Sequence, residues 1–108
     1  MARIFLILLP FFMTAAGLTQ AAATEPTPKR QVELLHLLRH DCGSCHGMRL
    51  EGGLGPALTP ARLASSSREQ LAATILHGRP GTPMPPWRPF LTEDEALWLA
   101  GRLKEGLK

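Results

Sequence analysis

The chain has 108 residues, which bounds it to one domain at most. Its formal net charge is +3, and its lysines and arginines are scattered, with no run longer than Lys29-Arg30. A nucleic-acid-binding surface needs clustered basic residues, so the composition argues against that class of protein. The two cysteines lie three positions apart, so a disulfide between them would join no distant segments. The core of a domain this small usually needs further stabilisation by disulfides, a metal or a cofactor, and we therefore expect a cofactor.

The first 23 residues have the features of an export leader. Arg3 supplies a positive start, residues 4–12 form a nearly unbroken apolar run, and Ala21-Ala22-Ala23 resemble a cleavage site. The apolar run is shorter than the about 20 residues that span a bilayer. We therefore predict a signal peptide at residues 1–23 and a domain at residues 24–108, with a retained membrane anchor as the alternative.

The first helix of the domain is predicted to begin at Pro28. Thr27 and Pro28 fit the N-cap and the first helical position. The helix is predicted to run to about Asp41 and to end just before the cysteine segment. Its core face is predicted from the helical spacing of its apolar residues. These residues are Val32, Leu35 and Leu38, widened by Leu34 and Leu37.

A second helix follows a segment, residues 47–60, that is rich in glycine and proline and is predicted to be a loop. Ser67 and Gln70 form a capping box at the start of this helix, and Gly78 suits its C-terminal end. Its apolar stripe consists of Leu71, Ile75 and Leu76. Five prolines between residues 79 and 89 then exclude a helix there.

The last helix is predicted to start at Thr92, whose capping-box partner is Glu95. Its core face contains Leu97, Ala100 and Leu103. Three helices, joined by long loops and without an alternating strand pattern, predict an all-α fold. Loops of this length are unusual in a compact domain unless something packs between them.

Residues 42–46 form a C-x-x-C-H motif, which is the attachment signature of c-type haem. Two residues between the thiols of Cys42 and Cys45 suit the separation of two haem vinyl groups. The next residue, His46, is then placed beneath the iron as the proximal ligand. A thioredoxin-like redox pair would need a βαβ context, and a zinc site would need further ligands that the sequence lacks. We predict one covalent haem c.

Met84 is predicted to be the second axial ligand of the iron, completing a Met/His pair. Pro83 and Pro85 restrict the backbone on both sides, so its thioether is held at low entropic cost. Met48 follows His46 too closely to reach the other side of the haem. The competing ligands are the other three histidines of the domain. They are His36, His40 and His77.

The order of these motifs resembles class I cytochromes c. It consists of C-x-x-C-H, the loop Leu54–Leu58, a helix, the segment Met84–Trp87 and a last helix. The resemblance implies a fold in which the first and last helices cross beside one haem. It also implies that the carbonyl of Pro56 accepts a hydrogen bond from Nδ1 of His46, which fixes the ring. Pro56 and Trp87 are accordingly expected among the cofactor-binding residues.

The combination of residues 41–48, 52–60 and 75–87 resembles one subfamily, the NirC-type monohaem cytochromes c55X. This resemblance implies a monomeric periplasmic electron carrier, not an enzyme, that donates single electrons to a cytochrome cd1 nitrite reductase in denitrification. It would not stay in the membrane after leader cleavage. The alternatives are an accessory role in haem d1 maturation and a sensor in which Met84 dissociates to admit a ligand.

Overall fold

The computed structural model describes residue 17 and residues 22–107, and this part of the chain is helical without a strand. Most of the predicted leader lies outside the described residues. The elements are α1 (Pro28–Leu37), the π-helical η1 (Leu38–Cys42), α2 (Gly43–His46), α3 (Pro60–Leu63), α4 (Arg68–His77) and α5 (Glu93–Glu105). The three longest are the three helices predicted from the sequence. None of the helices in the described ranges has the length and apolar character needed to cross a bilayer.

The first helix does not end at Asp41, so the predicted boundary was wrong. The chain continues without a break from α1 through η1 and α2 to His46. The turn that ends it comes at Gly47, whose φ is +91°. A Cβ on Gly47 would lie 2.6 Å from the carbonyl oxygen of Gly52, so only glycine fits there. The C-x-x-C-H motif is therefore held on a helix and not on a loop.

Both predicted capping boxes are present. At the start of α4, the amide of Gln70 donates to the hydroxyl of Ser67 and the amide of Ser67 donates to the side chain of Gln70 (3.0 and 2.8 Å). Thr92 and Glu95 make the same pair of bonds at the start of α5 (3.2 and 2.9 Å). These bonds satisfy amides that a helix start leaves without an intrahelical partner.

A short helix, α3, was not predicted from the sequence. It starts at Pro60, and the hydroxyl of Thr59 accepts a bond from the amide of Arg62. The ammonium of Lys104 in α5 donates to the carbonyls of Leu63 (3.1 Å) and Ser66, which ties the end of α3 to the last helix. The charge of Lys104 also suits carbonyls at a helix C-terminus.

The core lies between α1–η1, α4 and α5. Leu34, Leu38 and Leu99 are its largest fully buried side chains. The expected core position of Val32 was wrong, because this side chain is 69% exposed. The buried stripe of α1 is centred on Leu34 and Leu38, four positions apart, and Val32 falls outside it. The remaining core side chains are Leu50, Leu63, Ala72, Leu76, Leu91, Ala96, Ala100 and Leu103.

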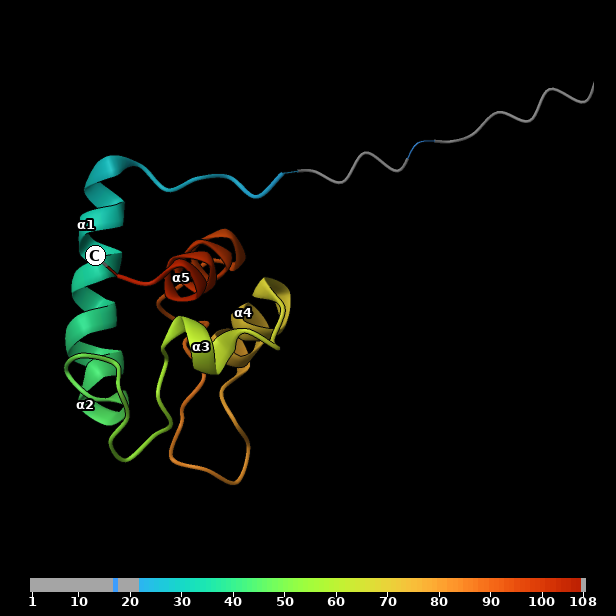
Figure 1. Ribbon diagram of the computed structural model, residues 1–108. Coiled ribbons are helices and arrows are strands. Elements are labelled where there is room, and N and C mark those ends of the chain that lie inside the picture. The colour runs from blue at the N-terminus through green and yellow to red at the C-terminus, as the bar shows by residue number, and fades with distance from the viewer. Residues whose placement is uncertain (1–16, 18–21, 108) are drawn as a thin grey trace, which may run out of the picture.

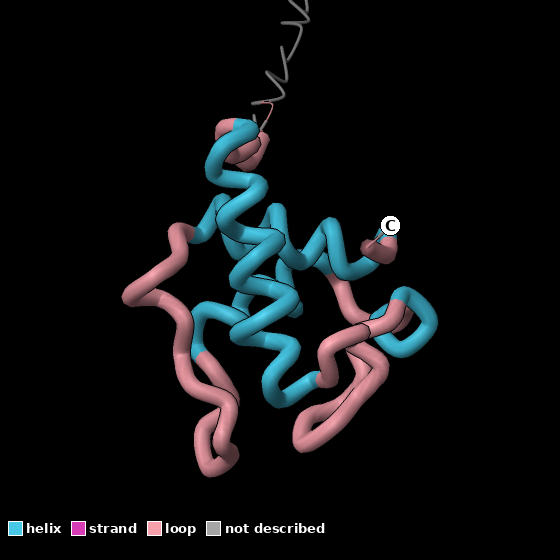
Figure 2. Tube along the Cα trace, turned by 90° about the vertical axis from the view of Figure 1, so that its left-hand side faces the viewer, coloured by secondary structure: helices cyan, strands magenta, loops and turns pink. Residues whose placement is uncertain are grey.

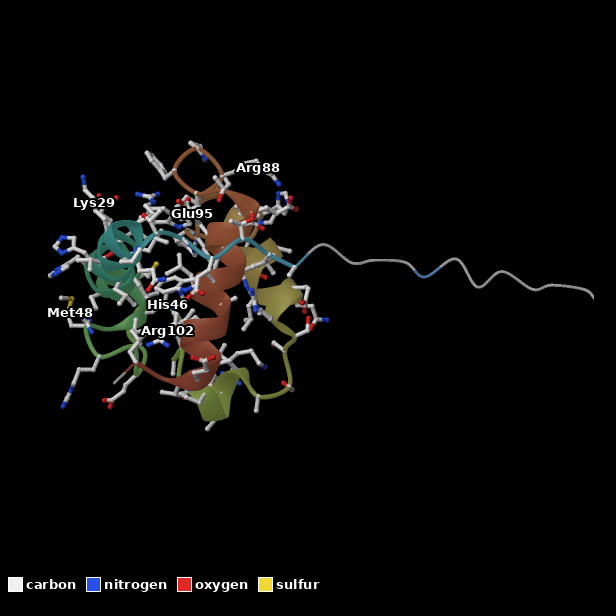
Figure 3. All side chains as sticks on the ribbon, turned by 90° about the horizontal axis from the view of Figure 1, so that it is seen from above. Lys29, His46, Met48, Arg88, Glu95 and Arg102 are labelled. Carbon is white, nitrogen blue, oxygen red and sulfur yellow. The ribbon has the colours of Figure 1, made fainter. Side chains whose placement is uncertain are left out.

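The starts of α1 and α5 are joined by an ion pair. Arg30 donates to both carboxylate oxygens of Glu95, from Nε at 2.6 Å and from a guanidinium nitrogen at 3.3 Å. It also bonds Glu33 and the carbonyl of Phe90. Figure 3 shows Glu95 on the side of α5 that faces α1. The first and last helices are thus fixed against each other near their N-terminal ends.

We expect Glu95→Gln to lower the free energy of unfolding of the holoprotein by about 1 kcal/mol at neutral pH, because the pair is partly exposed. The hydrogen bonds from Arg30 hold the pKa of Glu95 below its ordinary value. A carboxyl whose pKa is lowered on folding stabilises the protein above its unfolded pKa, and this stabilisation is lost as the pH falls through the folded pKa. The difference between the variant and the wild type should therefore be largest near neutral pH and vanish in acid.

Urea unfolding at a series of pH values measures this difference. Glutamine still suits the capping box with Thr92, so the substitution removes the charge and keeps the cap. Glu93→Gln is the matched control, since Glu93 lies in the same first turn and forms no ion pair among the described residues. A Glu95→Gln protein that is equally destabilised in acid and at neutral pH would contradict the assignment.

The two long loops lie at one end of the molecule. Residues 47–59 follow α2 and residues 78–91 follow α4, and both loops extend beyond the helices at the lower end of the views in Figures 1 and 2. The C-terminal end of the continuous helix α1–η1–α2 reaches the same end. The C-x-x-C-H motif and the segment that carries Met84, which are far apart in the sequence, are thereby brought to one region.

Candidate functional site: a haem-attachment segment and a methionine loop

The two cysteines of the motif are free thiols in different surroundings. Cys42 closes η1 and is partly buried, whereas Cys45 lies in α2 and is exposed. Burial, with a smaller contribution from the negative charge of Asp41, raises the pKa of Cys42 to about 11. A redox-active pair instead lowers the pKa of one thiol so that it attacks as a thiolate. The environment of Cys42 therefore does not fit a thioredoxin-like site.

The ring of His46 is oriented by a backbone carbonyl. Its Nδ1 lies 2.7 Å from the carbonyl oxygen of Pro56, which is the contact that the resemblance implied. A carbonyl only accepts, so Nδ1 carries the hydrogen and donates it. The lone pair of the imidazole then lies on Nε2, which is the atom available to a metal. Such a bond fixes the ring and raises the basicity of a ligating nitrogen.

The loop after α2 wraps around the motif through backbone contacts. The amide of Gly52 donates to the carbonyl of His46, and the amide of Gly55 donates to that of Cys45 (both 2.8 Å). A Cβ on Gly55 would lie 2.9 Å from Nδ1 of His46, and a Cβ on Gly53 would lie 2.9 Å from the carbonyl oxygen of Cys45. These glycines let the loop approach the histidine closely, a role that the sequence analysis missed.

Met84 is partly buried in the loop that follows α4. Its carbonyl accepts from the amide of Arg79 at 3.2 Å, and its amide lies 3.4 Å from the hydroxyl oxygen of Thr82. Trp87 is also partly buried and packs against the core. The centroids of its ring and that of Phe90 are 5.8 Å apart. The thioether is thus carried by a hydrogen-bonded turn, in a loop that reaches the same end of the molecule as His46.

The competing sulfur and nitrogen ligands lie elsewhere on the surface. Met48 is 62% exposed, and Figure 3 places it at the outer edge of the molecule, whereas His46 lies on the side that faces α5. His36 and His40 are exposed neighbours on α1 and η1, with ring centroids 4.2 Å apart. His77 is exposed at the end of α4. None of these four shares the restrained setting of His46 and Met84.

The residues present fit a covalently attached haem. Two free thiols and an imidazole with an available Nε2 lie within five consecutive residues of one helix, which is the donor set that haem c requires. The part of the chain that the structure describes has no cluster of three or more His, Cys, Asp or Glu side chains that could hold a metal ion by itself. The fold and this donor set define a c-type cytochrome.

The family comparison agrees with that class. The family model described as "Cytochrome C oxidase, cbb3-type, subunit III" matches residues 32–101. Cytochrome c55X of Pseudomonas aeruginosa is 59% identical over 92 residues, a match that covers 85% of this chain and 77% of the relative. The chain belongs to this family of c-type cytochromes and, within it, to the cytochromes c55X. Proteins of this family carry covalently bound haem c.

Two solved structures are also similar. The c-type cytochrome NirC is 61% identical, with a TM-score of 0.73, and the match covers 74% of this chain and 94% of that one. The dihydro-heme d1 dehydrogenase NirN, solved in complex with DHE, is 36% identical with a TM-score of 0.62. That match covers 68% of this chain but 16% of the dehydrogenase, so the likeness is to one portion of a larger protein.

Proposed function

We propose that this protein is a monomeric, periplasmic carrier of single electrons. Cys42 and Cys45 would attach the haem through thioether bonds, with His46 and Met84 as the axial ligands of the iron. When bound, the haem supplies an iron that cycles between ferric and ferrous states. The observation that carries the proposal is the restraint on both ligands. His46 is fixed by Pro56, and Met84 is fixed in its turn. Two filled axial positions favour electron transfer over the binding of a substrate.

The roles of the remaining site residues follow from their contacts. Pro56 holds the imidazole in one orientation through the bond to Nδ1. Trp87 lies three residues after Met84 and packs against the core, and it would shield the haem from water. Methionine as the second ligand raises the reduction potential relative to a pair of histidines. A relatively high potential suits a donor to a terminal reductase.

We propose a cytochrome cd1 nitrite reductase as the electron acceptor, reached after the leader, residues 1–23, has been removed during export. The similarity to cytochromes c55X and to NirC supports this partner. So does the charge of the methionine loop. Residues 78–91 contain Arg79 and Arg88 and no acidic side chain, and neither arginine forms an ion pair within residues 22–107. An acidic surface on the reductase would complement this loop.

Rapid mixing of the reduced cytochrome with oxidised nitrite reductase tests the proposed partner. We expect the cytochrome to be oxidised at a rate that rises linearly with the reductase concentration and falls as salt is added, because opposite charges steer the encounter. With nitrite present, turnover should continue as long as the cytochrome is kept reduced. A cytochrome that stays reduced in the presence of the active reductase would exclude this acceptor.

A role in haem d1 maturation is the second candidate function. The similarity to the dihydro-heme d1 dehydrogenase NirN favours it, since that protein was solved in complex with DHE. A strain lacking the cytochrome separates the two roles. Loss of nitrite reduction with a normal haem d1 content indicates electron donation, whereas loss of haem d1 indicates maturation. A ferrous–CO difference spectrum tests the third alternative, a ligand-binding sensor, which would bind CO readily.

A further inference from the structure

Gly78 lies where helix α4 gives way to the methionine loop, and it is buried. Its φ and ψ are +66° and −167°, a combination that is essentially restricted to glycine. A Cβ at this position would lie 2.7 Å from the carbonyl oxygen of Met84, 2.7 Å from the carbonyl carbon of Pro85 and 2.8 Å from the nitrogen of Pro86. All three are backbone atoms, so no change of rotamer could relieve the overlap.

The methionine loop is also bonded to the last turn of α4. The amide of Trp87 donates to the carbonyl of Ile75 (3.1 Å), and the amide of Arg88 donates to that of Leu76 (3.2 Å). Gly78 itself stays on the helix through its bond to the carbonyl of Thr74 (2.9 Å). The carbonyls of Ile75 and Leu76 lie in the last turn of α4, where a helix leaves its carbonyls without an intrahelical partner. The loop is therefore positioned directly by α4, whose Leu76 is anchored in the core.

We propose that Gly78 is a positioning residue for Met84, setting how far the methionine backbone lies from α4 and hence where the thioether stands. The prolines at 83, 85 and 86 have fixed φ angles and restrict the residues before them. The backbone of residues 83–86 is too restricted to relieve the overlap by a local change of dihedral angles. A Cβ on Gly78 therefore displaces this whole segment, and Met84 with it. This inference rests on the proposed role of Met84 as an axial ligand.

The same loop offers a matched control. Gly81 also has a positive φ, +77°, but a Cβ there would have no heavy atom within 4 Å. Gly81→Ala therefore introduces unfavourable backbone strain without a steric contact, whereas Gly78→Ala introduces both. An effect that Gly78→Ala shows beyond that of Gly81→Ala is assigned to the close approach of Gly78 to the methionine backbone together with its own φ and ψ.

The experiment compares the exported holoproteins of wild type, Gly78→Ala and Gly81→Ala. The readouts are the weak far-red sulfur-to-iron band of the oxidised protein, the reduction potential and the mass of the denatured chain. We expect Gly78→Ala to keep its covalent haem, to lose most of the band and to have a lower potential. Gly81→Ala should match the wild type in all three. In a Met84→Ala background, Gly78→Ala should cause no further drop in potential, because the two changes act through the same atom.

Three other results would contradict the positioning role of Gly78. A Gly78→Ala protein with the band and potential of Gly81→Ala overturns the positioning role and leaves the ligand assignment intact. A Gly78→Ala chain that carries no haem also overturns it, because a positioning role leaves attachment through the cysteines unaffected. A wild-type protein without the band refutes ligation by Met84, and the positioning role with it.

Discussion

Replacing both Cys42 and Cys45 with alanine will abolish covalent haem attachment. The wild-type chain, denatured after export, should exceed the mass of residues 24–108 by one haem, because both thiols form thioether bonds. The double variant should have the mass of the bare chain. Either single variant should keep one thioether and therefore some attached haem. Mass spectrometry of the denatured protein measures all four states. Since the core of a chain this small depends on its cofactor for stability, the double variant should also fail to fold stably.

Ser44→Ala is the matched control for this prediction. Ser44 lies between the cysteines and is exposed, and its hydroxyl donates to the carbonyl of Asp41 (2.7 Å). Its removal should leave the attached mass unchanged. A wild-type chain with the bare mass would refute the covalent attachment proposed for this protein. A mass that includes residues 1–23 would instead refute cleavage of the leader.

The features that the sequence predicted correctly depend on residues close together in the chain. The capping boxes of Ser67 and Thr92 join positions three apart, so the starts of α4 and α5 could be predicted without knowledge of the fold. The same is true of Thr27, which caps α1. Thr59 and Pro60 repeat the Thr-Pro pattern of α1, and α3 begins there, so that signal was present and was overlooked.

The features that were mispredicted depend on distant contacts. The end of the first helix is set at Gly47 by the approach of Gly52, which periodicity within α1 cannot show. Val32 fits a helical apolar stripe, yet the other helices cover the face that is centred on Leu34. Local patterns give the helical period but not which part of an apolar face the neighbouring helices bury.

The site divides in the same way. The haem-attachment site was predicted from the short C-x-x-C-H motif. The bond from His46 to Pro56 was implied by the resemblance, and the structure contains that bond. The close approach of Gly55 to His46 and of Gly78 to Met84 was not expected, because each depends on where a distant backbone lies. Gly78 was predicted as the end of α4, but that role does not reveal its contact with residues 84–86.

Met84→Ala should abolish the far-red sulfur-to-iron band of the oxidised protein. It should also lower the reduction potential by roughly 0.1 V or more, since axial ligation tunes haem potentials over about 0.8 V. The physical cause is that a soft thioether stabilises ferrous relative to ferric iron, and its loss admits water or a histidine. His77, exposed at the end of α4 and close in sequence to the methionine loop, is the histidine expected to replace it. Absorption spectroscopy and a redox titration measure both effects.

Met48→Ala is the control for the same measurements. This methionine is only two residues from His46, but it is 62% exposed and should leave the band and the potential at their wild-type values. If Met84→Ala matched the wild type in both spectrum and potential, one of the histidines at 36, 40 or 77 would have to be the second ligand. A pair of histidines would place the potential lower. The protein would then be a weaker donor to nitrite reductase, and the maturation role would become the stronger of the two proposals.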